Sequence, residues 1–232
     1  MEKTLGVIGG MGPMASQLFY KMVTEHTRAE KDQDHIRMVI LSDTKMPDRT
    51  GAILSGDTGA VARQILSDAR FLESAGCDLI CVTCNTAHYF VDLVSSEVSV
   101  PFIHMIRETA AEMAAQHPSG KIGIMATTGT VNTGLYQNTL NEYGLEPFVP
   151  SSSVQDLVMH EIYDCIKAGR RYDIDAWETI TKEFREAGCD SVLLACTELS
   201  VIRYDEHLDD WFTDPMLIMA RRAIEACGKE YI

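Results

Sequence analysis

Short apolar runs alternate with longer helical patterns along this chain, and this alternation constrains its fold more than any other feature. The apolar runs have the character of buried β-strands and cover residues 4–10, 36–43, 78–84, 100–105, 121–127, 146–150 and 191–196. Amphipathic patterns predict helices over residues 13–30, 57–75, 86–97, 105–117, 132–143, 152–168, 173–187 and 215–228. Pro13 fits a first helical turn, and Asp57 and Asp214 fit helix N-caps. Apolar strands separated by helices are typical of parallel sheets covered on both faces, so the sequence predicts an α/β protein.

An internal repeat indicates two similar halves. The segments FLESAGCDLICVTCNT (71–86) and FREAGCDSVLLACTEL (184–199) share a helix end, Ala-Gly-Cys-Asp, a buried strand, a cysteine and a nearby threonine. The segments LGVIGGMGP (5–13) and KIGIMATTGT (121–130) also correspond, because each is a strand followed by a glycine-containing turn. The repeat predicts two parallel-sheet α/β domains related by a pseudo-twofold axis. No linker separates the halves, so we expect the chain to cross between them near residues 101–104.

Cys84 and Cys196 occupy corresponding positions at the carboxyl ends of two predicted strands. Ligands of open parallel sheets bind beyond these strand ends. If the two halves face each other, the two thiols oppose one another across a single interdomain cleft. A thiolate on one side of a carbon atom can remove a proton while a thiol on the other side delivers one, which inverts a stereocentre. The remaining cysteines are interpreted as ordinary buried residues: Cys77, Cys81, Cys165, Cys189 and Cys227.

Small polar side chains follow the same strand ends. Asn85 and Thr86 come directly after Cys84, Thr197 follows Cys196, and Thr127 and Thr130 follow the strand at 121–127. Singly, each threonine fits a turn or a helix cap. Together, their donors can hold a substrate carboxylate and withdraw charge from a carbanion that forms on the adjacent carbon.

Composition narrows the range of partners. The formal net charge is −14 and there is no Lys/Arg run, which disfavours binding to nucleic acid or to anionic membranes. No apolar segment approaches the roughly 18 residues of a spanning helix, and the N-terminus does not match a signal peptide. Seven cysteines in a chain of this length indicate free thiols, and the Cys81-x-x-Cys84 spacing has no second pair to complete a metal site. We expect a cytoplasmic protein that acts on a small molecule.

Several motifs, taken together and in order, resemble the aspartate/glutamate racemase family, most closely its aspartate racemase branch. They span nearly the whole chain: GVIGGMGPMAS (6–16), PDRT (47–50), CNTAH (84–88), ATTGT (126–130), IYDCIKAG (162–169), CTEL (196–199) and DPM (214–216). The resemblance implies a racemase that interconverts L- and D-aspartate without a cofactor or a metal, and that forms a homodimer. It also implies that the first domain, residues 1–104, is completed by residues 207–232, and that residues 105–206 form the second.

The resemblance assigns roles to individual residues. Cys84 and Cys196 would be the two catalytic bases, and Arg49 and Lys167 would recognise the acidic substrate. The α-carboxylate side would be bound by Asn85, Thr86, Thr127, Thr130 and Thr197, with Met11 and the glycine turn beneath the substrate. Arginine suits this task because its guanidinium pairs with a carboxylate through two parallel hydrogen bonds.

Three positions qualify the resemblance. Ala195 stands where the family often has glycine. Glu198 stands where the glutamate racemase branch usually has histidine, which favours aspartate as the substrate and leaves glutamate or a broader acidic set open. His88 is interpreted as an orienting or structural residue rather than a proton carrier.

Other functions compete with this interpretation. Residues 10–15 fit the G-x-G-x-x-A pattern of a nicotinamide enzyme, but Pro13 lies in the phosphate turn and Asp43 follows at a longer spacing than the usual acidic residue. A two-lobed binding protein would need neither thiol. Relatives in the wider superfamily isomerise maleate, racemise hydantoins or decarboxylate arylmalonates; Arg49 and Lys167 favour an amino dicarboxylate over an apolar substrate but leave maleate open.

Overall fold

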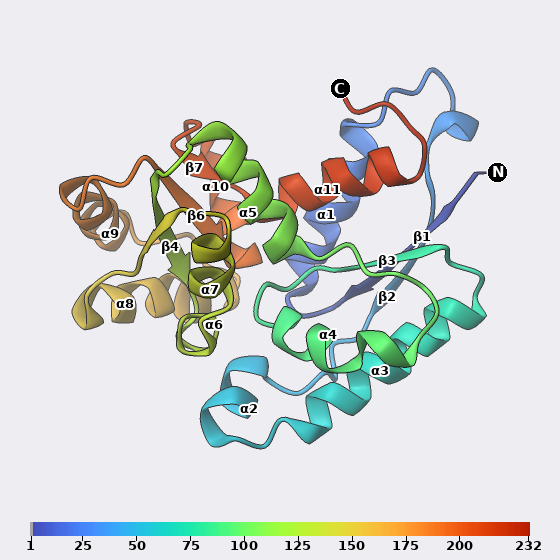
Figure 1. The fold of residues 1–232 in the computed structure, drawn as a ribbon, viewed down its shortest axis with the longest axis horizontal. Coiled ribbons are helices and arrows are strands. Elements are labelled where there is room, and N and C mark those ends of the chain that lie inside the picture. Colours follow the sequence, from blue (N-terminus) through green and yellow to red (C-terminus); the bar gives the residue numbers. More distant parts are fainter. Residues whose placement is uncertain (1) are drawn as a thin grey trace.

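Two separate parallel sheets organise the computed structural model, which describes residues 2–232 (Figure 1). The first sheet has the order β2-β1-β3 and consists of β1 (Thr4–Gly9), β2 (Arg37–Ser42) and β3 (Leu79–Val82). The second has the order β5-β4-β6-β7 and consists of β4 (Lys121–Ala126), β5 (Glu146–Phe148), β6 (Ser191–Ala195) and β7 (Phe212–Thr213). All strand pairs are parallel. The predicted α/β class with two parallel-sheet domains is confirmed.

Helices cover both faces of the first sheet. Alternate strand residues point to opposite faces, so Leu5 and Val7 pack on one side and Ile8 on the other. The first side is covered by α1 (Pro13–Glu25) and α11 (Pro215–Ala226). The second is covered by α3 (Gly59–Ser74) and α4 (His88–Val94). Short elements complete this half: α2 (Arg49–Ser55) and the 3₁₀ helices η1 (Asp32–Asp34) and η2 (Ser95–Glu97).

The second sheet is covered in the same way. Ile122 and Ile124 of β4 pack against α5 (Met105–Gln116) and α7 (Leu135–Glu142). Met125 faces the opposite layer, which consists of α8 (Ser152–Met159), the π-helix η3 (His160–Ile166), α9 (Ile174–Glu186) and α10 (Thr197–Glu206). The short helix α6 (Thr128–Thr133) leads from β4 to α7. Burial of each large apolar side chain in these layers contributes about 1.5–3 kcal/mol to folding.

The C-terminal helix α11 returns to the first sheet. Met216 and Met219 share a core cluster with Leu5, and α11 lies beside both α1 and α5 in Figure 1. Asp214 caps this helix as predicted, accepting a hydrogen bond from Met216 N at 2.8 Å. Of residues 207–232, α11 thus packs on the first sheet, whereas β7 pairs with β6 of the second sheet, and the domain boundary at residue 207 stays a prediction.

Some predicted elements differ from those observed. The predicted strand at residues 100–105 is reduced to a single bridge between Phe102 and Ile80, because Pro101 has no N–H group to continue a ladder. The predicted helix at 132–143 is interrupted at Gly134, whose φ of +68° ends α6 before α7 begins. Asp57 is not a cap, since α3 follows Thr58. The sequence interpretation also omitted helices α2 and α10 and strand β7.

The two cysteines, Cys84 and Cys196, follow corresponding strands of the two sheets. β3 lies beside the central strand β1, and β6 lies beside the central strand β4. Cys84 comes two residues after β3, and Cys196 comes directly after β6. Both sulfurs therefore come from carboxyl ends of parallel strands, where the repeat placed them. Within residues 2–232, no helix is both long enough and apolar enough to cross a membrane.

We predict that Gly10→Ala destabilises the fold more than Gly76→Ala. Both glycines have positive φ, of +85° and +78°, which costs an alanine about 1–2 kcal/mol. A Cβ atom at Gly10 would also lie 2.6 Å from the backbone nitrogen of Asp43, whereas nothing lies within 4 Å of one at Gly76. Urea denaturation should show an extra loss of about 1–3 kcal/mol for Gly10→Ala. Equal losses would show that the turn after β1 relaxes freely.

Candidate active site

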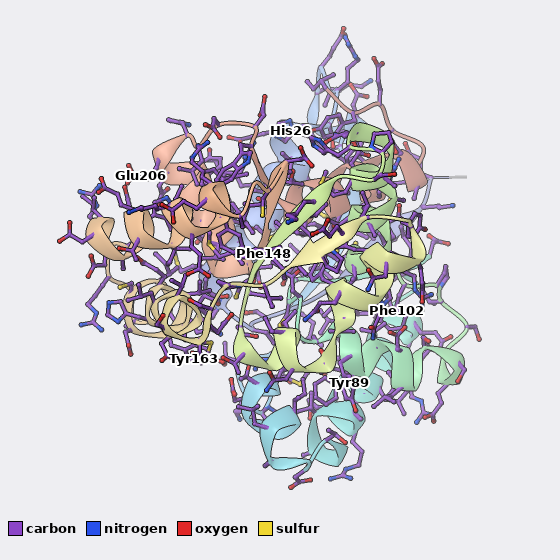
Figure 2. The ribbon with its side chains drawn as sticks, turned by 60° about the vertical axis from the view of Figure 1, so that its left-hand side comes forward. His26, Tyr89, Phe102, Phe148, Tyr163 and Glu206 are labelled. Atoms are coloured by element: carbon purple, nitrogen blue, oxygen red, sulfur yellow. The ribbon has the colours of Figure 1, made fainter. Side chains whose placement is uncertain are left out.

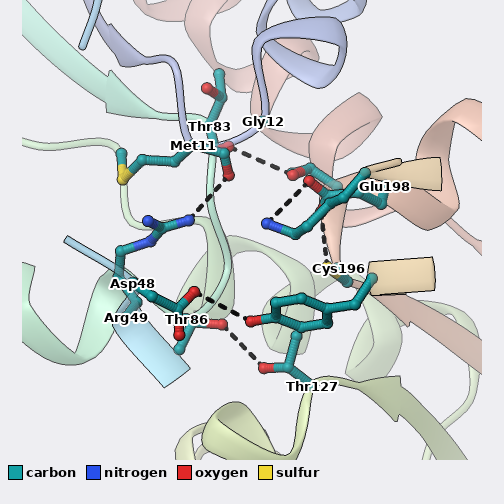
Figure 3. Close-up of polar contacts among 12 residues, drawn as sticks. Met11, Gly12, Asp48, Arg49, Thr83, Thr86, Thr127, Cys196 and Glu198 are labelled. Atoms are coloured by element: carbon teal, nitrogen blue, oxygen red, sulfur yellow. Dashed lines mark hydrogen bonds and ion pairs between the residues drawn. The ribbon is translucent and has the colours of Figure 1, made fainter. Parts of the chain in front are cut away.

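Cys196 lies beside a carboxylate. Its side chain is nearly buried, and Sγ donates a hydrogen bond to Glu198 Oε2 at 2.9 Å (Figure 3). Burial raises the pKa of Cys196 well above its ordinary value, and the negative charge of Glu198 raises it further, while the Lys167 ammonium acts in the opposite direction. Cys196 is therefore a protonated thiol at neutral pH and can act as an acid.

Cys84 lies beside a cation. Arg49 is only 7% exposed, and burial lowers its pKa, but the Cys84 sulfur and the Asp48 carboxylate outweigh that effect and leave the pKa raised. The guanidinium thus places a permanent positive charge beside the Cys84 sulfur. The two sulfurs face charges of opposite sign, which is the main asymmetry in an otherwise repeated arrangement.

Arg49 is held in place by backbone carbonyl groups, and its neighbour Asp48 is held by contacts of its own. Its guanidinium donates to Pro47 O at 3.0 Å. It also donates to Met11 O at 3.3 Å (Figure 3). Asp48 caps α2 by accepting from Gly51 N, and its other oxygen accepts from the Tyr163 hydroxyl at 3.2 Å. Tyr163 lies on η3, where that segment approaches α2 (Figure 2). The residue that precedes the cation is therefore contacted from the second half of the chain.

Lys167 supplies the second cation of the site. It comes directly after η3, and Nζ lies 3.3 Å from Glu198 Oε1 and 5.1 Å from the centre of the Tyr163 ring. Burial lowers the pKa of Lys167, but Glu198 and then the sulfurs of Cys196 and Cys84 raise it, and the net shift is upward. Lys167 is thus within electrostatic range of both thiols.

Three threonine hydroxyls join the two halves. Thr86 Oγ1 lies 3.1 Å from Thr127 Oγ1 and 2.8 Å from Thr130 Oγ1, and the last two are 3.1 Å apart. Thr127 also caps α6 by accepting from Thr130 N. A further link runs from Thr197 Oγ1 to Thr83 O at 3.4 Å. All are buried, so these hydroxyls lie at the junction of the two sheets rather than on the surface.

Asn85 has an amide group that is only half satisfied. Its Oδ1 accepts from the Tyr136 hydroxyl at 2.6 Å, while Nδ2 is buried and has no hydrogen-bond partner among the described residues. A buried donor without a partner is costly unless a ligand completes it. Asn85 therefore offers an N–H group to a bound anion.

A cavity of about 300 Å³ lies beside these groups. Of the residues predicted from sequence, Met11, Arg49 and Lys167 line it directly. The other predicted residues are buried and are not part of the cavity wall: Cys84, Asn85, Thr86, Thr127, Thr130, Cys196 and Thr197. The wall also contains Asp48, Tyr163 and Glu198, which the sequence interpretation did not place in the site. Each had a signal, because all three lie inside motifs quoted above: Asp48 in 47–50, Tyr163 in 162–169 and Glu198 in 196–199.

His88 holds the backbone of Cys84. Met105 N donates to Nε2 at 3.1 Å, so the ring proton is on Nδ1, which donates to Cys84 O at 2.9 Å. Burial is the main reason that the pKa of His88 is lowered to about 3, followed by the neighbouring His104. The ring is neutral at physiological pH and agrees with an orienting role.

Other ligands fit the site poorly. Among residues 2–232, no group of three or more His, Cys, Asp or Glu side chains is arranged to hold a metal ion. The glycine turn at residues 10–12 also differs from a dinucleotide site. Glu198 Oε1 occupies the space beside Gly12, and its negative charge would oppose a phosphate there.

Comparisons with known proteins agree with this geometry. The family model described as Asp/Glu/Hydantoin racemase matches residues 8–223. The chain is 28% identical over 204 residues to the broad specificity amino-acid racemase RacX of Bacillus subtilis, covering 85% of this chain and 86% of that protein. It superposes on Picrophilus torridus aspartate racemase with a TM-score of 0.81 and 32% identity, covering 99% and 96% of the two chains. An aspartate racemase homologue from Pyrococcus horikoshii gives a TM-score of 0.77 and 27% identity, covering 97% and 99%.

We predict that the protein loses stability as the pH falls from about 6.5 toward 4, in part because of His88. The unfolded chain binds a proton at this residue near pH 6.5, whereas the folded protein, with a pKa of about 3, does not. The difference favours unfolding only below pH 6.5. Urea denaturation at pH 7 and pH 4.5 should show a smaller loss for His88→Asn than for the wild type.

His207→Asn is the matched control for this measurement. His207 is exposed and has a φ of +51°, which asparagine tolerates well. We expect this variant to show the wild-type pH dependence. The same pH dependence for His88→Asn and the wild type would contradict the assignment of a buried, neutral His88.

Proposed function

Because the chain belongs to the Asp/Glu/Hydantoin racemase family, we propose that it interconverts L- and D-aspartate by a two-base mechanism that uses Cys84 and Cys196 and needs no cofactor. The observation that carries the proposal is the charge contrast around the sulfurs. Arg49 places a positive charge beside the Cys84 sulfur, and Glu198 accepts a hydrogen bond from the Cys196 thiol. We therefore assign Cys84 as the base and Cys196 as the acid in the proposed reaction.

The proposed reaction is a proton transfer on each face of the α-carbon. The Cys84 thiolate removes the α-proton from one enantiomer, and the Cys196 thiol delivers its proton to the opposite face of the carbanion. The product is the other enantiomer, with Cys84 now a thiol and Cys196 a thiolate. Reaction in the reverse direction exchanges the two roles.

Charged and polar groups suit an acidic amino acid. Arg49 and Lys167 line the cavity and can each pair with a substrate carboxylate. The unpartnered Nδ2 of Asn85, together with the hydroxyls near Thr86, can bind the α-carboxylate and stabilise charge that develops beside the α-carbon. The 32% identity to an aspartate racemase favours aspartate. Glutamate is the alternative substrate, and the similarity to a broad specificity racemase supports testing both.

The setting of the reaction is also part of the proposal. We infer a homodimer that works in the cytoplasm, with the site at the junction of residues 1–104 and 105–206. The polar contacts that cross this junction, including Tyr163 to Asp48 and Thr86 to Thr127, support a site formed by both halves.

We predict that Cys84→Ala and Cys196→Ala each reduce racemisation of aspartate by at least about 10³-fold, because each variant removes one of the two proton-transferring groups. Polarimetry of L- and D-aspartate measures the rate in both directions. Far-ultraviolet circular dichroism should show unchanged folding.

Cys189→Ala provides the control for loss of a buried thiol. Cys189 is as buried as the two site cysteines but packs in the core beside α9. We expect this variant to retain racemase activity. Full turnover in Cys84→Ala or Cys196→Ala would refute the two-base assignment.

A further inference from the structure

Glu198 contacts three parts of the site at once. It is 3% exposed, its Oε2 accepts from Cys196 Sγ at 2.9 Å, and its Oε1 lies 3.3 Å from Lys167 Nζ. On the remaining side it faces the glycine turn, where a methyl group at Gly12 would overlap Oε1 (Figure 3). The Glu198 carboxylate is thus enclosed by the Cys196 thiol, the Lys167 ammonium and the backbone of Gly12.

Lys167 is a cation that an acidic substrate also needs. The cavity wall contains two positively charged side chains, Arg49 and Lys167. The Arg49 guanidinium already donates to Pro47 O and Met11 O, whereas Lys167 has Glu198 as its ion-pair partner. Glu198 therefore occupies the position on Lys167 that a substrate carboxylate would take.

Resting on the racemase function proposed above, we propose that Glu198 is an internal carboxylate that competes with the substrate for Lys167 and keeps the proton of Cys196 on sulfur. An amino acid with a second carboxylate can replace Glu198 as the partner of Lys167. An amino acid with an apolar side chain cannot, and leaves the Lys167–Glu198 pair closed. Glu198 is thereby a positioning residue whose pairing with Lys167 weakens the binding of dicarboxylates.

The charges around Cys196 are consistent with this role. Glu198 on α10 and Lys167, directly after η3, both influence the pKa of Cys196. Tyr163 on η3 and Tyr136 on α7 are close enough for Cys196 to influence their pKa values. Lys167 opposes the effect of Glu198, and both tyrosines are neutral, because burial raises their pKa values. Glu198 is thus the one negatively charged group of the four, and its removal must lower the pKa of Cys196.

Binding of succinate tests the competition without requiring turnover. Succinate has two carboxylates and no stereocentre, so calorimetric titration reports affinity alone. We expect Glu198→Gln to bind succinate about tenfold more tightly than the wild type, because the neutral side chain no longer holds Lys167. Glu206→Gln removes the same charge from the end of the same helix, where Glu206 pairs with Arg171, and should bind as the wild type does. Equal or weaker binding by Glu198→Gln would overturn the competition.

Kinetics test the second part of the proposal. For Glu198→Gln we expect a lower KM for aspartate and a lower kcat. For the enantiomer whose conversion needs Cys196 as a thiol, we also expect the alkaline limb of the pH–rate profile to move to lower pH. Glu198→Asp keeps the charge and should keep the wild-type alkaline limb. An unchanged limb in Glu198→Gln would overturn the role in holding the proton.

Different results would refute the proposed racemase function and the proposed competition of Glu198 for Lys167. A wild-type protein that does not racemise aspartate or glutamate refutes the proposed function, and the succinate titration still decides whether Glu198 competes for Lys167. A wild-type racemase whose Glu198→Gln variant shows unchanged succinate affinity refutes the inference alone.

Discussion

Burial of charged side chains at the junction of the two sheets is the constraint on which this site depends. Arg49 and Glu198 are almost completely buried, and a buried ion is tolerated only when charges and hydrogen bonds compensate it. Arg49 is compensated by backbone carbonyls, Asp48 and the Cys84 sulfur, and Glu198 by Lys167 and the Cys196 thiol. The same contacts that make these charges tolerable place a cation beside the Cys84 sulfur and a carboxylate beside the Cys196 sulfur.

The repeated fold explains why two similar strand ends meet, and the details at each end explain why they are not equivalent. β3 and β6 occupy corresponding places beside β1 and β4. The segments after these two strands differ, because the chain after Cys84 runs into a turn whose backbone His88 holds, whereas Cys196 is the N-cap of α10. The first turn of α10 places Glu198 beside the sulfur. An approximate symmetry therefore carries different charges beside the two sulfurs, as the proposed inversion at carbon requires of its acid and its base.

The sequence allowed prediction of those features that depend on local pattern. Apolar runs located the central strands, and the repeat located Cys84 and Cys196 at their ends. The sequence did not allow prediction of contacts between segments that lie far apart in the chain. The pairing of Glu198 with Lys167 depends on space left by Gly12, and the bond from Tyr163 to Asp48 depends on how η3 approaches α2. The break at Gly134 had a visible signal, a glycine within an otherwise periodic segment, which can take the positive φ that ends α6.

The most direct test of the two-base account traces deuterium in the wild-type protein. L-Aspartate is incubated in D₂O, and proton NMR with chiral separation records deuterium at the α-carbon of both enantiomers during the first turnovers. In D₂O the two thiols exchange their protons for deuterium before the substrate is added. The two-base mechanism predicts that deuterium then enters the product D-aspartate while the remaining L-aspartate keeps its proton, because removal and delivery involve different sulfurs. Deuterium that enters unreacted L-aspartate as fast as D-aspartate forms would show that one group both removes and returns the proton, and would contradict the account.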